Sequence, residues 1–281
     1  MASTGIIGVI LIIANIIFSY KGFANDIFFK RYEFEVEKIL IYKDYKRLVS
    51  SGFLHVSWAH LVFNMLSLYV FSEMMEISLG AIKFLIIYFA SLIGGNLLSL
   101  LINRNNKDYS SVGASGAICG IMFASIALFP GMGIGFFILP ISIPGWIYGI
   151  LFIAFSIYGI RSSKANIGHE AHLGGALIGM AVALIMQPSA FIENYFTILI
   201  ITIPTIVFIY IIIKKPDFLL VDNLFYKTHK DFYSIDQKYN FERNMKQQEI
   251  DRILDKISKR GMKSLTREEK EKLKKYSETI R

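Results

Sequence analysis

Long stretches without a charged side chain are the feature of this sequence that most restricts its fold. Such uncharged runs cover residues 2–20, 84–103, 109–160, 171–192 and 194–213. Each is long enough for one membrane-spanning helix of about 20 residues, and the longest is long enough for two. Charged residues make up only 19% of the chain, against roughly a quarter in soluble domains. The chain is therefore predicted to be a polytopic integral membrane protein.

The apolar pattern predicts an all-α bundle of seven membrane-spanning helices. The predicted spans are residues 4–20, 57–75, 83–102, 114–129, 145–160, 169–188 and 195–213. The second contains His60, Asn64 and Glu73, and polar groups at membrane depth usually face the interior of a bundle. Prolines and glycines between the fourth and fifth spans predict a loop. No basic residue precedes the first span, so we interpret it as a retained helix rather than a signal peptide.

Three parts of the chain differ in character. Residues 1–194 are expected to form a six-span membrane core, residues 195–213 a seventh span, and residues 214–281 a basic, soluble helical tail. Beside this many spans, a basic segment favours solvent or an anionic lipid surface over nucleic acid. We therefore expect the lipid bilayer as a partner and no nucleic acid.

Two regions outside the spans carry further structural signals. Residues 21–56 mix charged and apolar side chains, which predicts an interfacial, partly embedded loop. In the tail, Thr266 precedes Glu269 by three residues, the pattern of a capping box that begins a helix. An earlier tail helix, predicted to end at Gly261, has an apolar face made of Ile250, Ile253, Leu254 and Ile257.

Four of the five histidines lie in or beside predicted spans: His55, His60, His169 and His172. A lone histidine there usually hydrogen-bonds another helix, whereas a cluster also permits metal binding or catalysis. The stretch 169-HEAH-172 resembles a zinc motif, but its histidines are three residues apart instead of four. No other cysteine or carboxylate completes a ligand set, and the single Cys119 excludes an internal disulfide. We therefore expect no metal and no cofactor.

Ser115 lies in 113-GASGAICG-120, where a serine is either part of ordinary helix packing or a nucleophile. A catalytic serine needs a base within hydrogen-bond reach and donors for the oxyanion that forms on the attacked carbonyl. His60 and Asn64 are four residues apart, so they share one helix face and could be those donors. A histidine on a different span could be the base.

The glycines near these residues have two interpretations. Gly113 and Gly116 would let a substrate approach the backbone at a helix N-terminus, where free amides favour an anion. Gly116 with Gly120, and Gly175 with Gly179, form pairs that let helix backbones pack closely. Close packing would bring a short serine and an imidazole together. Alternatively, these glycines only pack helices.

In their order along the chain, these motifs resemble those of the rhomboid family of intramembrane serine proteases. The second-span pattern of two histidines and an asparagine matches 55-HVSWAHLVFN-64, and the nucleophile motif matches 113-GASG-116. The sixth-span motif matches 171-AHLGGALIG-179. The resemblance covers roughly residues 38–187 and does not extend to the tail.

The resemblance implies a Ser-His dyad and an oxyanion site. Ser115 would attack a peptide carbonyl, and His172 would take its proton and return it to the leaving amine. The Ser115 amide, His60 and Asn64 would hold the oxyanion, with His55 and Gly113 beside them. Structural support would come from Arg47, Gly116, Gly175, Gly179 and, at the start of the sixth span, His169.

Three further positions match the family less closely. Arg47 corresponds to the arginine of a Trp-Arg motif, but Lys46 replaces the tryptophan. The stretch 76-EISLG-80 is a looser match before the third span. Some family members place an aromatic residue four positions after the serine, where it stacks on the catalytic imidazole. Here that position is Cys119, so the resemblance leaves open what holds His172.

The resemblance implies an intramembrane serine endopeptidase that cleaves transmembrane protein substrates in or near their membrane-spanning helix. Two alternatives stay open: a catalytically silent rhomboid-like binder of membrane-protein clients, and a transporter or channel whose histidines relay protons. The latter needs acidic residues along a path, and the third to seventh spans hold only Glu170. The expected location is the bacterial cell (inner) membrane, and the sequence indicates no oligomeric state.

The seventh span raises a question of topology. A six-span core of this family begins and ends in the cytoplasm, so a seventh span would put the tail outside. The basic charge of the tail favours the opposite side, although long tails translocate with little regard to charge. The loop 161-RSSKANIG-168 is expected to cover the site.

Overall fold

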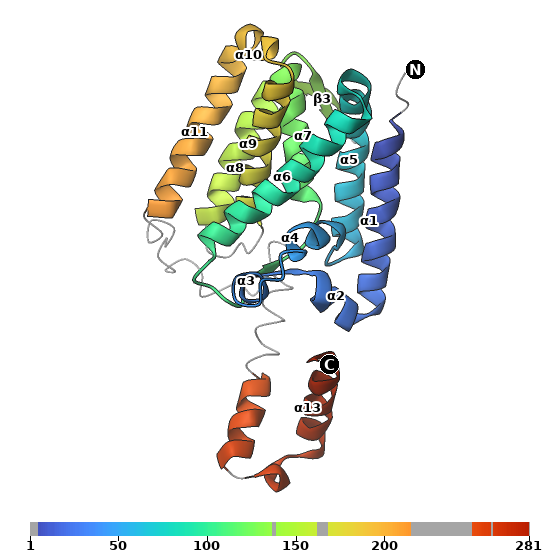
Figure 1. Cartoon of the computed structure of the whole chain (residues 1–281), viewed down its shortest axis with the longest axis vertical. Helices are drawn as coiled ribbons and strands as arrows, with labels where there is room; N and C mark the ends of the chain where they lie inside the picture. The colour runs from blue at the N-terminus through green and yellow to red at the C-terminus, as the bar shows by residue number, and fades with distance from the viewer. Residues whose placement is uncertain (1–4, 137–138, 162–167, 215–248, 260, 281) are drawn as a thin grey trace.

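A bundle of long helices makes up most of the protein (Figure 1). The computed structural model describes residues 5–136, 139–161, 168–214, 249–259 and 261–280. One long helix lies at each predicted span, so the helix predictions are confirmed. These helices are α1 (Ile6–Ala24), α5 (Trp58–Leu79), α6 (Ala81–Ile102), α7 (Ser115–Leu128), α8 (Gly145–Arg161), α9 (His169–Met186) and α11 (Tyr195–Lys214).

Not all seven helices have the length and hydropathy of a complete span. Four do (α1, α6, α9 and α11), and the number rises to five if α5 counts together with the short helices before it, which meet it at 96°. α7 and α8 are shorter apolar helices. The 14 residues of α7 measure roughly 21 Å at 1.5 Å per residue, less than the hydrocarbon thickness of about 30 Å. The protein is a mostly helical, multi-pass membrane protein.

The short helix α7 lies at the centre of the bundle. Every residue from Gly116 to Leu128 is buried, because α5, α6, α8 and α9 all pack around it. A helix that is apolar on all sides is expected only where no face meets water. Its first residue is Ser115, so the bundle holds that serine on its most enclosed helix.

Glycines allow α7 and α9 to lie in backbone contact. A Cβ atom at Gly175 would overlap the carbonyl of Gly116, and one at Gly179 would overlap the backbone of Gly120. α6 joins the same contact, because a Cβ atom at Gly95 would overlap the Ala171 carbonyl. In membranes, where lipid is as apolar as leucine, such close packing is a main source of helix association.

The N-terminus of α1 is capped by a side chain from another helix. Gly5 precedes α1 and offers no capping side chain. Instead, the Glu76 carboxylate of α5 accepts hydrogen bonds from the backbone amides of Ile7 (3.2 Å) and Gly8 (3.1 Å). A carboxylate there satisfies free amides and faces the positive end of the helix dipole. Glu76 is the first residue of the loosely matching stretch EISLG.

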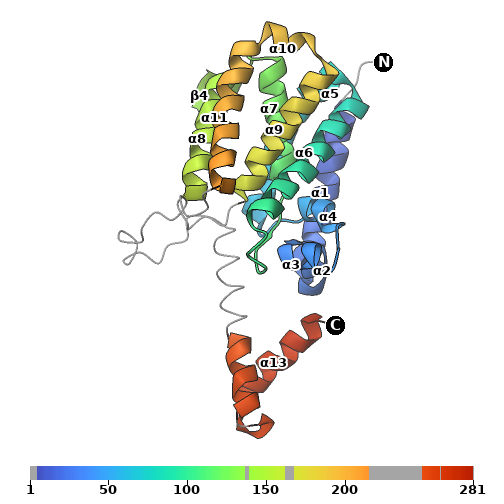
Figure 2. The same ribbon diagram turned by 60° about the vertical axis from the view of Figure 1, so that its left-hand side comes forward.

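The connection between α1 and α5, expected to be an interfacial loop, is folded into short elements around a small core of its own. Its elements are α2 (Asp26–Tyr32), β1 (Phe34–Glu35), α3 (Val36–Leu40), α4 (Arg47–Ser50) and the 3-10 turn η1 (Ser51–Phe53). Phe34, Val36, Ile39 and Leu48 bury their side chains against Tyr109. These elements lie at the end of the bundle opposite α10 (Ser189–Glu193) (Figure 2).

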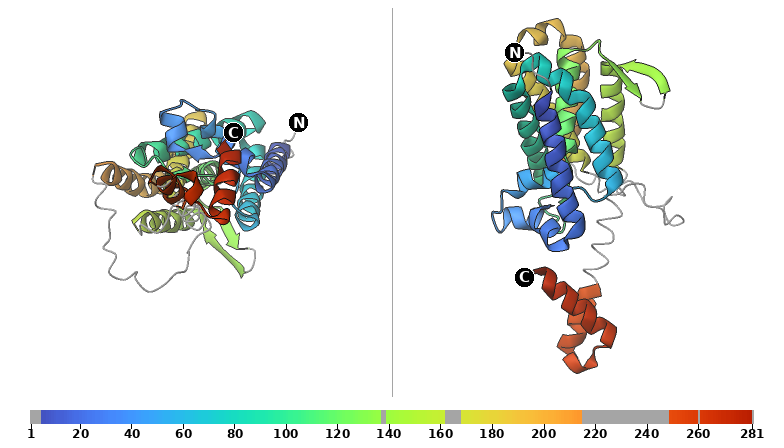
Figure 3. Two further views of the ribbon diagram at one scale, coloured as in Figure 1. Left: turned by 90° about the horizontal axis from the view of Figure 1, so that it is seen from below. Right: turned by 90° about the vertical axis from the view of Figure 1, so that its right-hand side faces the viewer.

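The all-α prediction is wrong in one respect, because two short antiparallel ribbons are present. β1 pairs with β2 (Ser110–Ser111). The second ribbon joins β3 (Gly133–Phe136) to β4 (Leu139–Pro144), with a bulge after Gly135. It occupies the segment predicted to be a loop and projects from the side of the bundle (Figure 3). The prolines and glycines were read only as helix breakers, and they are equally compatible with an irregular ribbon.

The tail contains two helices, residues 249–259 and α13 (Arg267–Ile280), separated by the 3-10 turn η4 (Met262–Ser264). The predicted capping box is confirmed: Thr266 N donates to the Glu269 carboxylate (2.7 Å), and Glu269 N donates to Thr266 Oγ1 (3.2 Å). Ile250 and Ile253 are buried against Leu265. Ile257 packs against the same cluster, whereas Leu254, which belongs to the same apolar face, is 47% exposed.

Substituting Gly179 with alanine is expected to destabilise the bundle, because the new methyl group would overlap the Gly120 backbone and backbone cannot rotate away. Overpacking of this kind costs about 1–3 kcal/mol, so the melting temperature of the purified protein in detergent should fall. Gly131→Ala is the matched control, since no atom lies within 4 Å of the added Cβ position. Equal melting temperatures for the two variants would contradict the packing argument.

Candidate active site

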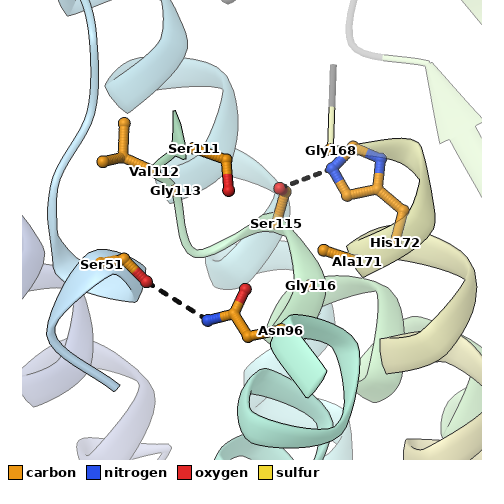
Figure 4. Close-up of a pocket in the computed structure, with 10 residues that line it drawn as sticks. All are labelled: Ser51, Asn96, Ser111, Val112, Gly113, Ser115, Gly116, Gly168, Ala171 and His172. Carbon is orange, nitrogen blue, oxygen red and sulfur yellow. Dashed lines mark hydrogen bonds between the residues drawn. The ribbon is translucent and has the colours of Figure 1, made fainter. Parts of the chain in front are cut away.

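Ser115 and His172 are in direct contact in the structure. Ser115 Oγ and His172 Nε2 are hydrogen-bonded at 2.6 Å (Figure 4). The serine is the first residue of α7, and the histidine lies in the first turn of α9. Because glycines hold these two helices in backbone contact, the short serine side chain can reach the imidazole. The distance and the pairing are those of a nucleophile and its base.

Among the residues that the structure describes, no acidic side chain completes a triad with Ser115 and His172. Within the described part of the chain, no carboxylate hydrogen-bonds the His172 ring; its two ring contacts are with His169 and Phe152. No group of three His, Cys, Asp or Glu side chains among the described residues is arranged to hold a metal ion.

Gly113 forms one wall of the space in front of the serine. Its φ of +132° lies in a region that side chains rarely adopt. A Cβ atom there would lie 3.0 Å from His60 Nε2 and 3.7 Å from Ser115 Oγ. The absence of that atom therefore leaves a space between the serine hydroxyl and the His60 imidazole. The first amides of α7 also border this region, and helix-terminal amides favour an anion.

His60 and Asn64 lie one turn apart on α5, as their spacing predicted. Ser57 begins this helix by accepting a hydrogen bond from His60 N at 3.2 Å. The side-chain amide of Asn64 donates to the His60 carbonyl at 2.9 Å. The Asn64 amide thus donates one N–H back along α5. The His60 ring lies beside the position that a Cβ atom of Gly113 would occupy, in the loop of residues 112–114 that precedes Ser115 (the serine loop).

His55 is one layer further from the serine. Its ring packs edge-on against His60, with centroids 4.9 Å apart. Its Nδ1 lies 2.9 Å from the hydroxyl of Ser19 on α1, and that hydroxyl donates to the Phe53 carbonyl at 3.0 Å. Since a hydroxyl has one proton to donate, Ser19 accepts from His55 Nδ1. His55 therefore links α1 to the ring that faces the serine loop. Ser19 was missed because one serine in a long apolar run is an ordinary packing residue.

Arg47 organises the segment beside the site. It is 5% exposed and donates from Nη1 to the carbonyls of Lys30 (2.8 Å) and Glu33 (2.7 Å). Its Nε donates to the Asp44 carboxylate at 2.9 Å. Partial burial acts to raise the pKa of Asp44, but the hydrogen bonds from Arg47 and Lys46 outweigh it and lower the pKa. Lys46, which replaces the family's tryptophan, is thus an exposed partner of the same carboxylate.

Backbone hydrogen bonds attach this segment to the serine loop. β1 pairs with β2 immediately before that loop, and Gly113 N donates to the Ser51 carbonyl at 3.0 Å. Asn96 of α6 donates to the Leu48 carbonyl (2.8 Å) and to Ser51 Oγ (3.2 Å). Ser51 and Asn96 were not predicted as site residues. The polar amide of Asn96 within an apolar span was the available signal.

A small cavity of about 20 Å³ lies beside the dyad (Figure 4). Its polar lining residues are Ser51, Asn96, Ser111, Ser115 and His172. A cavity of roughly 10–15 Å³ or more can hold one water molecule if polar partners are present. The hydroxyl and amide groups of the lining supply such partners. In the loop expected to cover the site, residues 162–167 lie outside the described part of the chain.

Comparison with known proteins agrees with the geometry. A family model described as the Rhomboid domain matches residues 42–189, and one described as a family of unknown function (DUF6576) matches residues 233–279. Rhomboid protein 1, mitochondrial, of Saccharomyces cerevisiae is 32% identical over 158 residues, which cover 54% of this chain and 46% of that protein. Rhomboid protease GluP of Bacillus subtilis is 33% identical over 147 residues, covering 51% and 27% respectively. The chain thus spans less than half the length of either relative.

Substituting Gly113 with alanine is expected to place a methyl group between Ser115 and His60. Loss of oxyanion binding typically costs about 100- to 1,000-fold in rate, so labelling of Ser115 by a fluorophosphonate should slow by at least roughly 100-fold. Gly80→Ala is the matched control, because Gly80 also has a positive φ (+83°) but no atom within 4 Å of the added Cβ position. If both variants lose labelling equally, backbone strain and not the blocked space is the cause.

Proposed function

This chain belongs to the rhomboid family, and from that premise we propose that it is an intramembrane serine endopeptidase that cleaves membrane-spanning proteins in or near their transmembrane helix. The family model covers more than half of the chain and includes every residue to which we assign a catalytic role. The observation that carries the proposal is the 2.6 Å hydrogen bond between Ser115 and His172. It joins a nucleophile to a base on helices that pack without side chains between them.

The proposed reaction uses these two residues in turn. Ser115 Oγ attacks the substrate's peptide carbonyl, and His172 Nε2 takes the serine proton. His172 then gives that proton to the leaving amine, and the peptide bond breaks to leave an acyl ester on Ser115. A water molecule, deprotonated by His172, attacks the ester carbonyl. The bond between the acyl carbon and Ser115 Oγ then breaks, His172 returns the proton to Ser115 Oγ, and the second product leaves as a carboxylic acid. The 20 Å³ cavity beside the dyad is where we place this water.

The developing negative charge needs donors fixed in advance. We assign that role to the Ser115 backbone amide and to His60, which borders the space beside Gly113. Asn64 joins them when its amide turns from the His60 carbonyl toward the substrate. His55 keeps the His60 ring in place through its contact with Ser19.

Hydrolysis within a membrane requires water below the bilayer surface. Because α7 is shorter than the bilayer core, its first residue is recessed among longer helices, and the polar groups of the segment before α5 lie at the same end. A substrate helix hides its carbonyls in backbone hydrogen bonds, so we expect cleavage where helix-weakening residues loosen it. Transmembrane proteins are the proposed substrates.

The arrangement of helices supports a six-span core, made of α1 and α5–α9, followed by α11 as a seventh span. α9 begins at the catalytic end with His172, and α10 turns the chain at the opposite end (Figure 2). α11 then returns, so the tail after Lys214 leaves the membrane on the catalytic side. We propose that residues 214–281 form a soluble unit on that side. Relatives come from mitochondria and from bacteria, and the bacterial cell membrane stays our prediction for this chain.

Removing either member of the dyad is expected to abolish proteolysis. Purified wild type should cut a single-span substrate in detergent, whereas Ser115→Ala and His172→Ala should lower the rate by at least roughly 10⁴-fold, as in other serine proteases. Ser125→Ala is the matched control, since the hydroxyl of this buried serine of the same helix donates to the helix's own backbone, at Ile121 O. Equal cleavage by all four proteins would reject the dyad. Client capture without cleavage by wild type would favour the silent binder.

The side of the tail can be tested with reporters. A phosphatase that is active only outside the cytoplasm, fused after Arg281, should be active if the tail lies on the catalytic side. The same reporter fused after Glu193, at the turn between α9 and α11, should be inactive. Equal activity of the two fusions would show that α11 does not cross the membrane.

A further inference from the structure

We infer that Phe152 of α8 is the aromatic residue that positions the catalytic imidazole in this protein. The inference rests on the proposed function, because it concerns the base of the same dyad. Four residues after the nucleophile, where an aromatic residue would stack on the base, the chain has Cys119. This thiol is buried within the core, and it has no ring with which to cover His172.

A ring from a different helix contacts the imidazole instead. The centroids of Phe152 and His172 are 6.2 Å apart, and the ring planes meet at 43°. Aromatic pairs interact favourably at centroid distances of about 4.5–7 Å in offset or tilted arrangements. The contact therefore gives His172 an aromatic neighbour. Residue 119 does not supply one, because it is a cysteine.

The Phe152 ring is itself held in place. It packs against Phe123 at 5.6 Å and 64°, and against Tyr148 at 6.4 Å and 25°. Phe123 belongs to α7, the helix that begins with Ser115. The ring thus connects the helix of the nucleophile to the base on α9, so their relative position depends on three helices instead of two.

A second ring, that of His169 on the same helix α9, also restricts rotation of the His172 imidazole. His169, one turn earlier, packs edge-on against His172 with centroids 5.7 Å apart. Phe155 of α8 packs in turn against His169 at 5.5 Å. Tyr148, Phe152 and Phe155 follow one another at helical spacing, so one stripe of α8 faces both histidines. This role for His169 agrees with the structural function expected of it.

These contacts supply what an acidic third residue supplies in a triad. In such triads a carboxylate holds the imidazole in the correct orientation, and no described carboxylate bonds His172 here. Ring contacts on two sides, together with the hydrogen bond to Ser115, restrict the same rotation. Phe152 is a positioning residue, since it touches the base and not the reacting atoms.

The test compares full-length wild type, Phe152→Leu, Phe152→Tyr and Phe155→Leu in detergent. The readouts are kcat and KM for a single-span substrate, the rate of Ser115 labelling by a fluorophosphonate, and the melting temperature. A ring contact of this type corresponds to about a 3- to 10-fold change in rate. Phe152→Leu should lower kcat and labelling by that factor at unchanged KM, and Phe152→Tyr should restore both. Phe155→Leu removes the ring that packs against His169 and leaves the contact between Phe152 and His172 in place, so it should lower kcat and labelling less than Phe152→Leu.

The inference is overturned if Phe152→Leu keeps the wild-type kcat, if Phe155→Leu loses as much, or if tyrosine does not restore the rate. Should the leucine variant fail to fold, Phe152→Met makes the same comparison, because methionine fills a similar volume without a ring. If wild type itself neither cleaves nor labels, the proposed function fails. If wild type is active and all the variants keep its kcat and labelling rate, only the inference about Phe152 fails.

Discussion

The backbone contact between α7 and α9 is the constraint on which the rest of the site depends. A serine side chain reaches only a short distance from its helix, so an imidazole on another helix can meet it only if the two backbones nearly touch. Gly116, Gly120, Gly175 and Gly179 permit that approach. The same residues that stabilise the bundle thereby set the 2.6 Å distance of the dyad. Stability and catalytic geometry come from one interface.

Polar contacts of the connection between α1 and α5 hold the loop that precedes Ser115. Arg47 ties this connection into a compact unit through carbonyls, and the Ser51 carbonyl binds the serine loop at Gly113. Arg47 makes these contacts although Lys46 stands where the family motif has a tryptophan. A guanidinium with several donors can bind carbonyls from different turns at once, and an exposed neighbour is not needed for that.

Much of the site was predictable because membrane burial makes polar residues informative. His60, Asn64, Ser115 and His172 stand out in apolar runs, and helical spacing places the first two on one face. Phe152 and Phe123 could not be recognised in the same way, because aromatic residues are common in apolar helices. The ribbon of β1 and β2 was also missed, since its hydrogen bonds join segments distant in sequence. The ribbon of β3 and β4 is local, but its prolines and glycines are equally typical of a loop.

The sequence by itself determined a multi-pass helical membrane protein, the positions of its long helices, and a set of polar residues fit for nucleophilic catalysis. Apolar length and side-chain periodicity are local properties, so they can be read without a fold. The tertiary structure was needed to find that Asn64 bonds back along its helix, that His55 packs against His60, and that an aromatic ring from α8 contacts His172. Those facts depend on distances of a few ångströms between separate helices, and side-chain packing sets them after the helices associate.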